Sequence, residues 1–196
     1  MNDSRHSLPP NLPEPSDDGA CSHLLGMRLP PIALPATTGE PIDLSSHAGL
    51  AVIYCYPATG TPGVPSPSGW DEFPGARGCT PQSCAYRDHN EDLQALGATV
   101  YGVSAQTTEA QQEAAERLEL PFPLLSDAAF TFTRALRLPT FELEAKRYLK
   151  RDTFVVQDGI IEKVFYPVFP PENNAEEVIA WLRARRASRE AAARMS

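Results

Sequence analysis

Residues 58–78 hold nine prolines and glycines, and this stretch constrains the fold more than any other part of the chain. Proline lacks a backbone N–H and blocks a helix interior, and glycine weakens helices and strands. We therefore expect an irregular loop. A loop this long inside a compact domain is typically either functional or disordered. Because it contains Trp70 and Phe73, we expect it to pack against the domain, either as the wall of a channel or as buried anchors.

Regular structure is predicted on both sides of this loop. Residues 50–56 are continuously apolar and rich in β-branched and aromatic side chains, and they end at Pro57. That pattern predicts a buried strand. After the loop, residues 85–96 predict a helix that ends at Gly97, and residues 98–104 predict a second buried strand.

The remaining pattern predicts a mixed α/β fold. Strand–helix alternation favours parallel strands, and a late hairpin adds antiparallel ones. The expected elements are a hairpin turn at 37–40, a helix at 107–118, an extended segment at 122–125, a helix at 127–136, strands at 150–157 and 160–166 around an Asp158–Gly159 turn, and a helix at 172–184.

The domain organisation follows from the same pattern. Residues 1–24 are rich in proline, serine and aspartate, which predicts a flexible N-terminal arm. Residues 25–184 form the predicted domain, with residues 58–78 as a loop insertion, and residues 185–196 form a basic tail.

Composition excludes several classes of function. A net charge of −8 and a pI near 5.0 argue against a nucleic-acid or anionic-membrane binder. No apolar run is long enough to span a bilayer, and the first ten residues lack the apolar core of a signal peptide. We therefore expect a cytoplasmic protein, in which the four cysteines are not structural disulfides.

Two of those cysteines belong to the hexapeptide CTPQSC at residues 79–84, where the loop gives way to a helix. Unpaired N–H groups at a helix N-terminus favour the thiolate, the reactive form of cysteine. In an unbroken helix, Cα atoms five residues apart are about 8.7 Å from each other, whereas a disulfide needs about 4.4–6.8 Å. Either the first turns unwind, or Cys79 lies outside the helix. Pro81 favours the second option, with Thr80 as the N-cap.

The chain resembles the peroxiredoxins, in particular the peroxiredoxin Q (bacterioferritin comigratory protein) branch. The resemblance rests on residues 56–57 and 78–88, then on residues 125–127 and residues 151–156 ahead of the Asp158–Gly159 turn. It covers residues 26–184 in order and implies a thioredoxin-like fold with a central mixed sheet flanked by helices.

The resemblance also implies a reaction. Cys79 is then the peroxidatic cysteine, which a peroxide oxidises to a sulfenic acid, and Cys84 is the resolving cysteine, which condenses with it to a disulfide. A thioredoxin- or glutaredoxin-type partner would reduce that disulfide. The implied substrates are hydrogen peroxide and organic hydroperoxides, without metal, haem or flavin, in a monomer or weak homodimer.

Three further residues are candidates for this site. The resemblance assigns charge stabilisation to Arg151, against the alternative of a surface ion pair. The family pattern also places a proline, then a threonine, then the cysteine. Pro57 and Thr61 fit its first half, but Val64 stands where the cysteine would be. We interpret the intervening residues as an insertion that loops out and leaves Pro57 and Thr61 at the pocket. Counting back from Cys79 instead would place Ala76 at the hydroxyl position.

Other interpretations remain open. Cys55 is expected to be a core residue, and Cys21 either an incidental thiol or a second resolving cysteine. A zinc site built on Cys79, Cys84 and His89 lacks a fourth ligand. The functional alternatives are a thiol–disulfide oxidoreductase, which would normally use Cys-x-x-Cys, and a redox sensor that uses the same disulfide as a switch.

Overall fold

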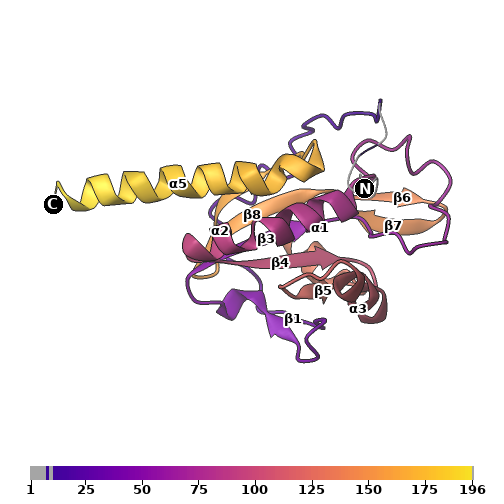
Figure 1. Ribbon diagram of the computed structural model, residues 1–196, viewed down its shortest axis with the longest axis horizontal. Helices are drawn as coiled ribbons and strands as arrows, with labels where there is room; N and C mark the ends of the chain where they lie inside the picture. Colours follow the sequence, from indigo (N-terminus) through magenta and orange to yellow (C-terminus); the bar gives the residue numbers. More distant parts are fainter. Residues whose placement is uncertain (1–7, 9–10, 196) are drawn as a thin grey trace.

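The computed structural model describes residue 8 and residues 11–195. Its centre is a five-stranded mixed sheet with the strand order β5-β4-β3-β8-β9 (Figure 1). The strands are β3 (Leu50–Cys55), β4 (Ala98–Ser104), β5 (Leu124–Ser126), β8 (Asp152–Gln157) and β9 (Ile160–Phe165). β3, β4 and β5 are parallel, whereas β8 pairs antiparallel with both β3 and β9. This is the predicted α/β architecture, with helices on both sides of a mixed sheet.

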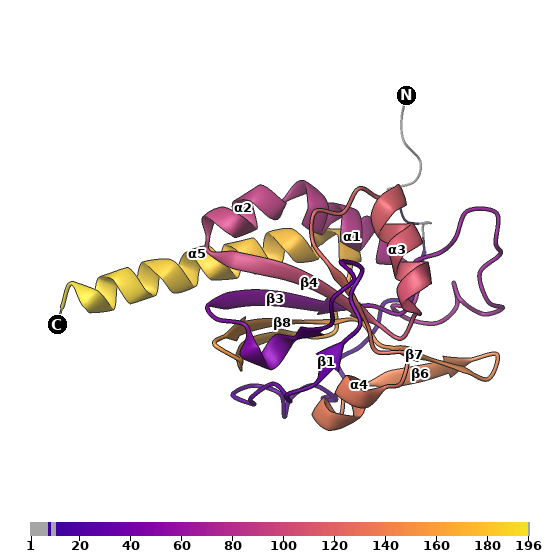
Figure 2. The same cartoon turned by 90° about the horizontal axis from the view of Figure 1, so that it is seen from below.

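Helices cover the two faces of the sheet (Figure 2). On one face lie α1 (Cys79–Asp88), α2 (Asn90–Ala95) and α5 (Asn174–Ala193), and on the other lies α4 (Thr131–Leu136). The remaining elements are α3 (Thr108–Arg117), which packs on β5, the small strand pair β1 (Ala33–Leu34) and β2 (Ile42–Asp43), and the hairpin β6 (Thr140–Leu143) and β7 (Lys146–Leu149).

Alternation along β3 divides the core into two clusters. Val52 and Tyr54 pack on the α1 and α5 side, and Ile53 and Cys55 pack on the opposite side. Successive side chains of a strand point to opposite faces, so the position of a residue along β3 or β8 decides which cluster it joins. Cys79 belongs to the first cluster.

Several predicted elements are confirmed. The buried strands occur at β3 and β4, and Thr107 caps α3 by accepting from the Ala110 N–H at 3.4 Å. The helix predicted for residues 127–136 begins only at Thr131, but the Asp127 carboxylate does accept hydrogen bonds from two backbone N–H groups at its start. The β8–β9 turn has positive φ at Asp158 and Gly159, the geometry that an Asp-Gly turn favours.

Two expectations were wrong, and one element was missed. The single helix predicted for 85–96 is two helices, because the backbone at His89 leaves the helical region (φ −102°, ψ 11°). The β6–β7 hairpin was missed, since its turn residues Glu144 and Ala145 have positive φ but carry no turn signal in the sequence. The last helix does not end at Ala184 but continues to Ala193 and extends beyond the body (Figure 1), because residues 185–193 contain no breaker.

The segment predicted as an N-terminal arm, residues 1–24, lies partly outside the described residues. From residue 11 onward it follows the surface of the domain, and Cys21 and Leu24 are buried in the core. The Asp18 carboxylate binds Lys150 Nζ at 2.8 Å and accepts from the Tyr166 hydroxyl at 2.7 Å. The arm is therefore attached close to the beginning of β8.

The insertion at residues 58–78 contains no strand or α-helix. Trp70 is buried, and it packs with Phe73, Phe141 and Tyr148 in a small aromatic cluster. The insertion is thereby anchored on the β6–β7 hairpin. Among the described helices, none is both long and apolar enough to cross a membrane.

Candidate active site

Cys79 is the first residue of α1. The preceding Gly78 has φ 109°, a left-handed conformation that glycine adopts readily. A Cβ at Gly78 would lie 2.3 Å from the side chain of Pro171, so a larger residue would clash. Cys79 is 4% exposed, and its Sγ lies 3.7 Å from the carbonyl oxygen of Ala76.

Arg151 is the cation beside this sulfur. It immediately precedes β8, its side chain is buried, and its Nη2 lies 3.2 Å from Cys79 Sγ. The same nitrogen donates to the carbonyl oxygens of Gly75, Ala76 and Arg77 at 3.2–3.3 Å. The guanidinium thus ties the end of the insertion to the start of α1. Arg151 is therefore not part of a surface ion pair with a carboxylate, which was the alternative interpretation of this residue.

Gln82 and Asn174 hold Arg151 in place, and sequence reasoning missed both. Gln82 Oε1 accepts a hydrogen bond from Arg151 Nη1, and Gln82 Nε2 donates to Asn174 Oδ1 at 3.1 Å. The same Asn174 oxygen accepts from the hydroxyls of Tyr86 at 2.6 Å and Thr153 at 2.8 Å. A usable signal for Gln82 was its spacing, because residues three apart lie on the same face of a helix and Gln82 follows Cys79 by three. Nothing in the sequence pointed to Asn174.

The phenols in this layer are neutral. Burial raises the pKa of Tyr54 and Tyr86 well above the usual value for tyrosine. Tyr86 therefore acts as a hydrogen-bond donor to Asn174, and Tyr54 shares a hydrogen bond of 3.1 Å with the hydroxyl of Ser83. These contacts fix the underside of α1 on the sheet, and with it the position of Cys79.

Cys84 lies on the same helix and is 2% exposed. All four cysteines are reduced. The expectation that Cys79 stands outside the helix, with Thr80 as the N-cap, was wrong: the helix begins at Cys79, and the N-cap is Gly78. Gln82 N–H bonds back to the Gly78 carbonyl at 3.0 Å. Two residues five apart in a helix have a Cα–Cα distance longer than a disulfide permits. A Cys79–Cys84 disulfide therefore requires the first turns of α1 to unwind.

The structure separates the other two predicted residues. Pro57 is buried directly after β3, whereas Thr61 is exposed on the insertion. Among the described contacts, no hydrogen bond joins the Thr61 hydroxyl to Cys79 or Arg151. Ala76, the other residue considered for this position, contributes its carbonyl oxygen instead of a hydroxyl.

Cys55 and Cys21 belong to the opposite core cluster. Burial raises the pKa of both thiols, which disfavours the reactive thiolate. Cys55 is paired across the strands with Asp152, and burial raises the pKa of that carboxyl to about 7. Within the described residues, no three His, Cys, Asp or Glu side chains are arranged to hold a metal.

Comparison with known proteins gives consistent matches. The family model described as Redoxin matches residues 24–179. A chloroplastic peroxiredoxin Q from Sedum lineare is 31% identical over 161 residues, which cover 81% of this chain and 77% of that protein. A chloroplastic peroxiredoxin Q from Gentiana triflora is 28% identical over 185 residues, 91% of this chain and 77% of that one.

Solved structures give the same result. The peroxidoxin BcpB from Mycobacterium tuberculosis superimposes with a TM-score of 0.66 at 30% identity, covering 82% of this chain and 96% of that one. Peroxiredoxin Q from Xanthomonas campestris superimposes with a TM-score of 0.61 at 22% identity, covering 87% and 96%. The second likeness concerns the fold alone.

Proposed function

The chain belongs to the Redoxin family, in its peroxiredoxin Q and bacterioferritin comigratory protein branch, and on that premise we propose that Cys79 carries its thiol peroxidase activity. The contact of 3.2 Å between Arg151 Nη2 and Cys79 Sγ is the observation that supports this assignment most. A guanidinium keeps its charge at all working pH values. It therefore stabilises negative charge that develops on the leaving oxygen as the O–O bond breaks.

The first step oxidises the sulfur. The Cys79 thiolate attacks one oxygen of the peroxide, an S–O bond forms and the O–O bond breaks. The sulfur becomes a sulfenic acid, and the leaving oxygen takes up a proton from solvent to give water or an alcohol. Arg151 is positioned by Gln82 and by the carbonyl oxygens of residues 75–77, so its orientation is set before substrate arrives.

The second step is resolution by Cys84. Its thiolate attacks the sulfenic sulfur, a disulfide forms and hydroxide leaves as water. Burial of both thiols and the intact first turns of α1 mean that this step needs local unwinding. Unwinding would also release Gln82 from Arg151 and Asn174, because both contacts are made by a residue on the turn that moves.

A thioredoxin- or glutaredoxin-type dithiol is the reductant we propose, since it exchanges with an exposed disulfide through a mixed disulfide. The thiols of the resting protein are covered, so the reductant would meet its target only in the unwound state. The cytoplasmic location and the monomeric or weakly dimeric state stay predictions.

The assignment is tested by mass spectrometry and peptide mapping of the reduced protein after one equivalent of hydrogen peroxide. The wild type is expected to form a Cys79–Cys84 disulfide, and Cys84→Ser to stop at an oxidised Cys79. Cys55→Ser is the matched control, because it removes a buried thiol on the other face of the sheet and should leave the disulfide unchanged. A Cys79 that stays reduced would contradict the proposal.

Turnover separates the alternatives. A peroxidase consumes many equivalents of hydrogen peroxide when a thioredoxin system is supplied. A redox sensor oxidises once and stops, and a thiol–disulfide oxidoreductase reduces a protein disulfide in the absence of peroxide. Consumption of no more than one equivalent, with the disulfide formed, would favour the sensor.

A further inference from the structure

Two glycines just before Cys79 lie against the N-terminal arm. A Cβ at Gly78 would lie 3.3 Å from the side chain of Leu8, and a Cβ at Gly75 would lie 3.5 Å from the side chain of Pro15. Gly78 is the N-cap of α1, and Gly75 belongs to the end of the insertion. The arm therefore contacts the segment of residues 75–78, which leads into α1, at two points along its length.

Arg151 and Pro171 hold the same segment. Arg151 Nη2 donates to the carbonyl oxygens of residues 75–77 and lies 3.2 Å from Cys79 Sγ. A Cβ at Gly78 would lie 2.3 Å from the side chain of Pro171, so this glycine is in close contact with the residues that precede α5. The segment therefore cannot shift without losing contacts to the domain and to the arm together.

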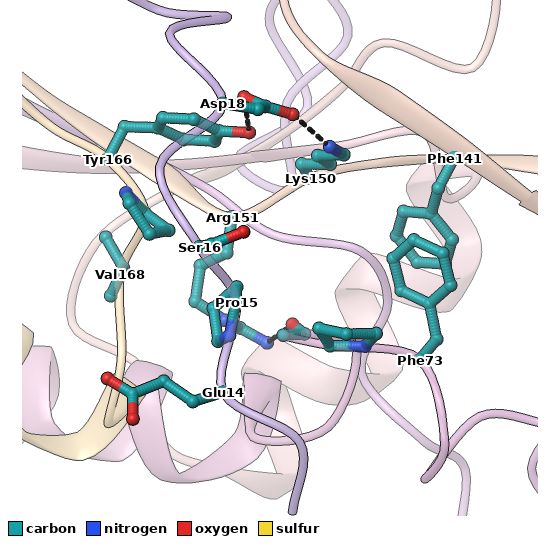
Figure 3. Close-up of a pocket in the computed structure, with 13 residues that line it drawn as sticks. Glu14, Pro15, Ser16, Asp18, Phe73, Phe141, Lys150, Arg151, Tyr166 and Val168 are labelled. Atoms are coloured by element: carbon teal, nitrogen blue, oxygen red, sulfur yellow. Dashed lines mark hydrogen bonds and ion pairs between the residues drawn. The ribbon is translucent and has the colours of Figure 1, made fainter.

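The arm is attached to the domain through Asp18. Its carboxylate binds Lys150 Nζ at 2.8 Å and accepts a hydrogen bond from the Tyr166 hydroxyl at 2.7 Å (Figure 3). These bonds, the one to Lys150 most of all, lower the pKa of Asp18 to about 2, so the carboxylate stays ionised at neutral pH. The Asp18 and Lys150 side chains are 45% and 30% exposed, and ion pairs in contact with water are weak. The attachment thus persists at neutral pH but can be broken at small cost.

The arm has a point about which it can detach. Gly19 has φ 74°, and a Cβ there would meet no atom within 4 Å. After this turn, Cys21 and Leu24 are buried in the core. Before it, Pro15 and Arg151 line a cavity of about 180 Å³ between the arm and the domain (Figure 3). The arm before Gly19 therefore meets the domain at separate points and not by continuous packing, whereas the residues after it are fixed.

Formation of the disulfide moves the segment that the arm contacts. A bond between Cys79 and Cys84 requires the first turns of α1 to unwind. The residues directly before Cys79 change position with it, and the arm lies against two of them, Gly75 and Gly78. Contacts that exist only in the wound state raise the free energy of local opening, and they lower the population of the opened state. The contacts of the arm therefore oppose disulfide formation.

We propose that the arm before Gly19 acts as a strap that keeps α1 wound, and that its attachment through Asp18 sets how fast the disulfide forms. The proposal rests on the proposed function, in which the Cys84 thiolate attacks the sulfenic sulfur of Cys79. In that step the S–S bond forms, the S–O bond breaks and hydroxide leaves as water. Oxidation of Cys79 needs no unwinding, so the strap acts on the second step alone and lengthens the life of the sulfenic acid. Asp18 and Leu8 are thus positioning residues.

The test measures both steps on the reduced full-length protein. The protein is mixed with hydrogen peroxide, quenched with acid at set times and analysed by mass spectrometry, which separates the reduced, sulfenic and disulfide forms. The variants are Asp18→Asn, which removes the charge of the attachment, and a double variant that adds Leu8→Ala. The matched control is Asp17→Asn, which removes the same charge from the neighbouring residue, whose carboxylate accepts only from the Gly19 N–H of the arm itself among the described contacts.

We expect the rate constant for disulfide formation to rise about threefold in Asp18→Asn and roughly fivefold or more in the double variant, since an exposed ion pair contributes a factor of this size. The rate constant for oxidation of Cys79 should stay within about twofold of the wild type in both variants, and Asp17→Asn should leave both rate constants within about twofold. An unchanged or slower disulfide step in the double variant, or an equal rise in Asp17→Asn, would overturn the proposal.

A second measurement does not depend on the chemistry of the thiols. Amide hydrogen exchange of residues 79–84 in the reduced protein reports how often α1 opens, and it should be faster in the double variant than in the wild type or in Asp17→Asn. Equal exchange in all three proteins would overturn the proposal. A wild type whose Cys79 is not oxidised by hydrogen peroxide would instead refute the proposed function, whereas the exchange rates would still decide whether the arm keeps α1 wound.

Discussion

Replacing Asp152 by asparagine should change how stability depends on pH. Asp152 is fully buried, and within the described residues no N–H or O–H group donates a hydrogen bond to either carboxyl oxygen. Burial raises its pKa from 3.8 to about 7, and the neighbouring Cys55 thiol and Arg151 charge offset only a part of that. The native protein therefore keeps this proton between pH 4 and pH 7, whereas the unfolded chain loses it.

The sign and the magnitude follow from linkage. A proton held more tightly by the native state stabilises it at low pH, and that stability is lost as the pH rises through the folded pKa. The whole effect is roughly 4 kcal/mol, of which roughly 3 kcal/mol falls between pH 5 and pH 8. Asparagine does not ionise, so Asp152→Asn should lack this loss. Burying the amide also changes the free energy of unfolding by an amount that does not depend on pH. That amount cancels when the difference between Asp152→Asn and the wild type at pH 8 is compared with the difference at pH 5.

The assay is urea unfolding of the reduced protein at pH 5, 6, 7 and 8, followed by tryptophan fluorescence. The free energy of unfolding of Asp152→Asn relative to the wild type should rise by roughly 3 kcal/mol from pH 5 to pH 8. Glu91→Gln, which removes an exposed carboxylate, should show little change over that range. If the relative stability of Asp152→Asn is the same at pH 5 and pH 8, the pKa of the buried carboxyl is not raised.

Three further predictions concern the site. Arg151→Lys keeps the charge but loses the guanidinium fork, so the rate constant for oxidation of Cys79 by hydrogen peroxide should fall roughly 100-fold; stopped-flow fluorescence measures it, and an unchanged rate would show that the charge alone suffices. Asn174→Leu leaves three buried donors without their acceptor, which should lower the free energy of unfolding by on the order of 3 kcal/mol or more; a loss below 1 kcal/mol in urea titrations would contradict this. Gly78→Ala would place a Cβ 2.3 Å from the Pro171 side chain at φ 109° and should lower the free energy of unfolding by roughly 2 kcal/mol or more. Thermal unfolding measures this loss, and an unchanged melting temperature would show that the 3-10 helix Pro171–Asn173 moves aside at no cost.

Local patterns in the amino-acid sequence were enough to predict several elements of the fold. The apolar run before Pro57 predicted β3, the Asp158–Gly159 turn predicted the β8–β9 hairpin, and the breakers of residues 58–78 predicted the irregular insertion. Each pattern works within a few residues, because backbone conformation and side-chain periodicity are local properties. The Glu144–Ala145 turn lacks the residues typical of a turn, so the β6–β7 hairpin was not predicted.

The assembly of the site depends on contacts between distant parts of the chain. Arg151 reaches Cys79 across 72 residues, and Gln82 meets Asn174 across 92. These contacts depend on the register of β8 against β3 and on the packing of α5 against α1, which no short segment encodes. The same packing leaves the Thr61 hydroxyl exposed and brings the arm against the insertion beside Arg151. The sequence was enough to identify the reactive thiol, but not the groups that surround it. A charged guanidinium is stable in the core only where several acceptors take its hydrogen bonds, and those acceptors are brought together by the tertiary fold.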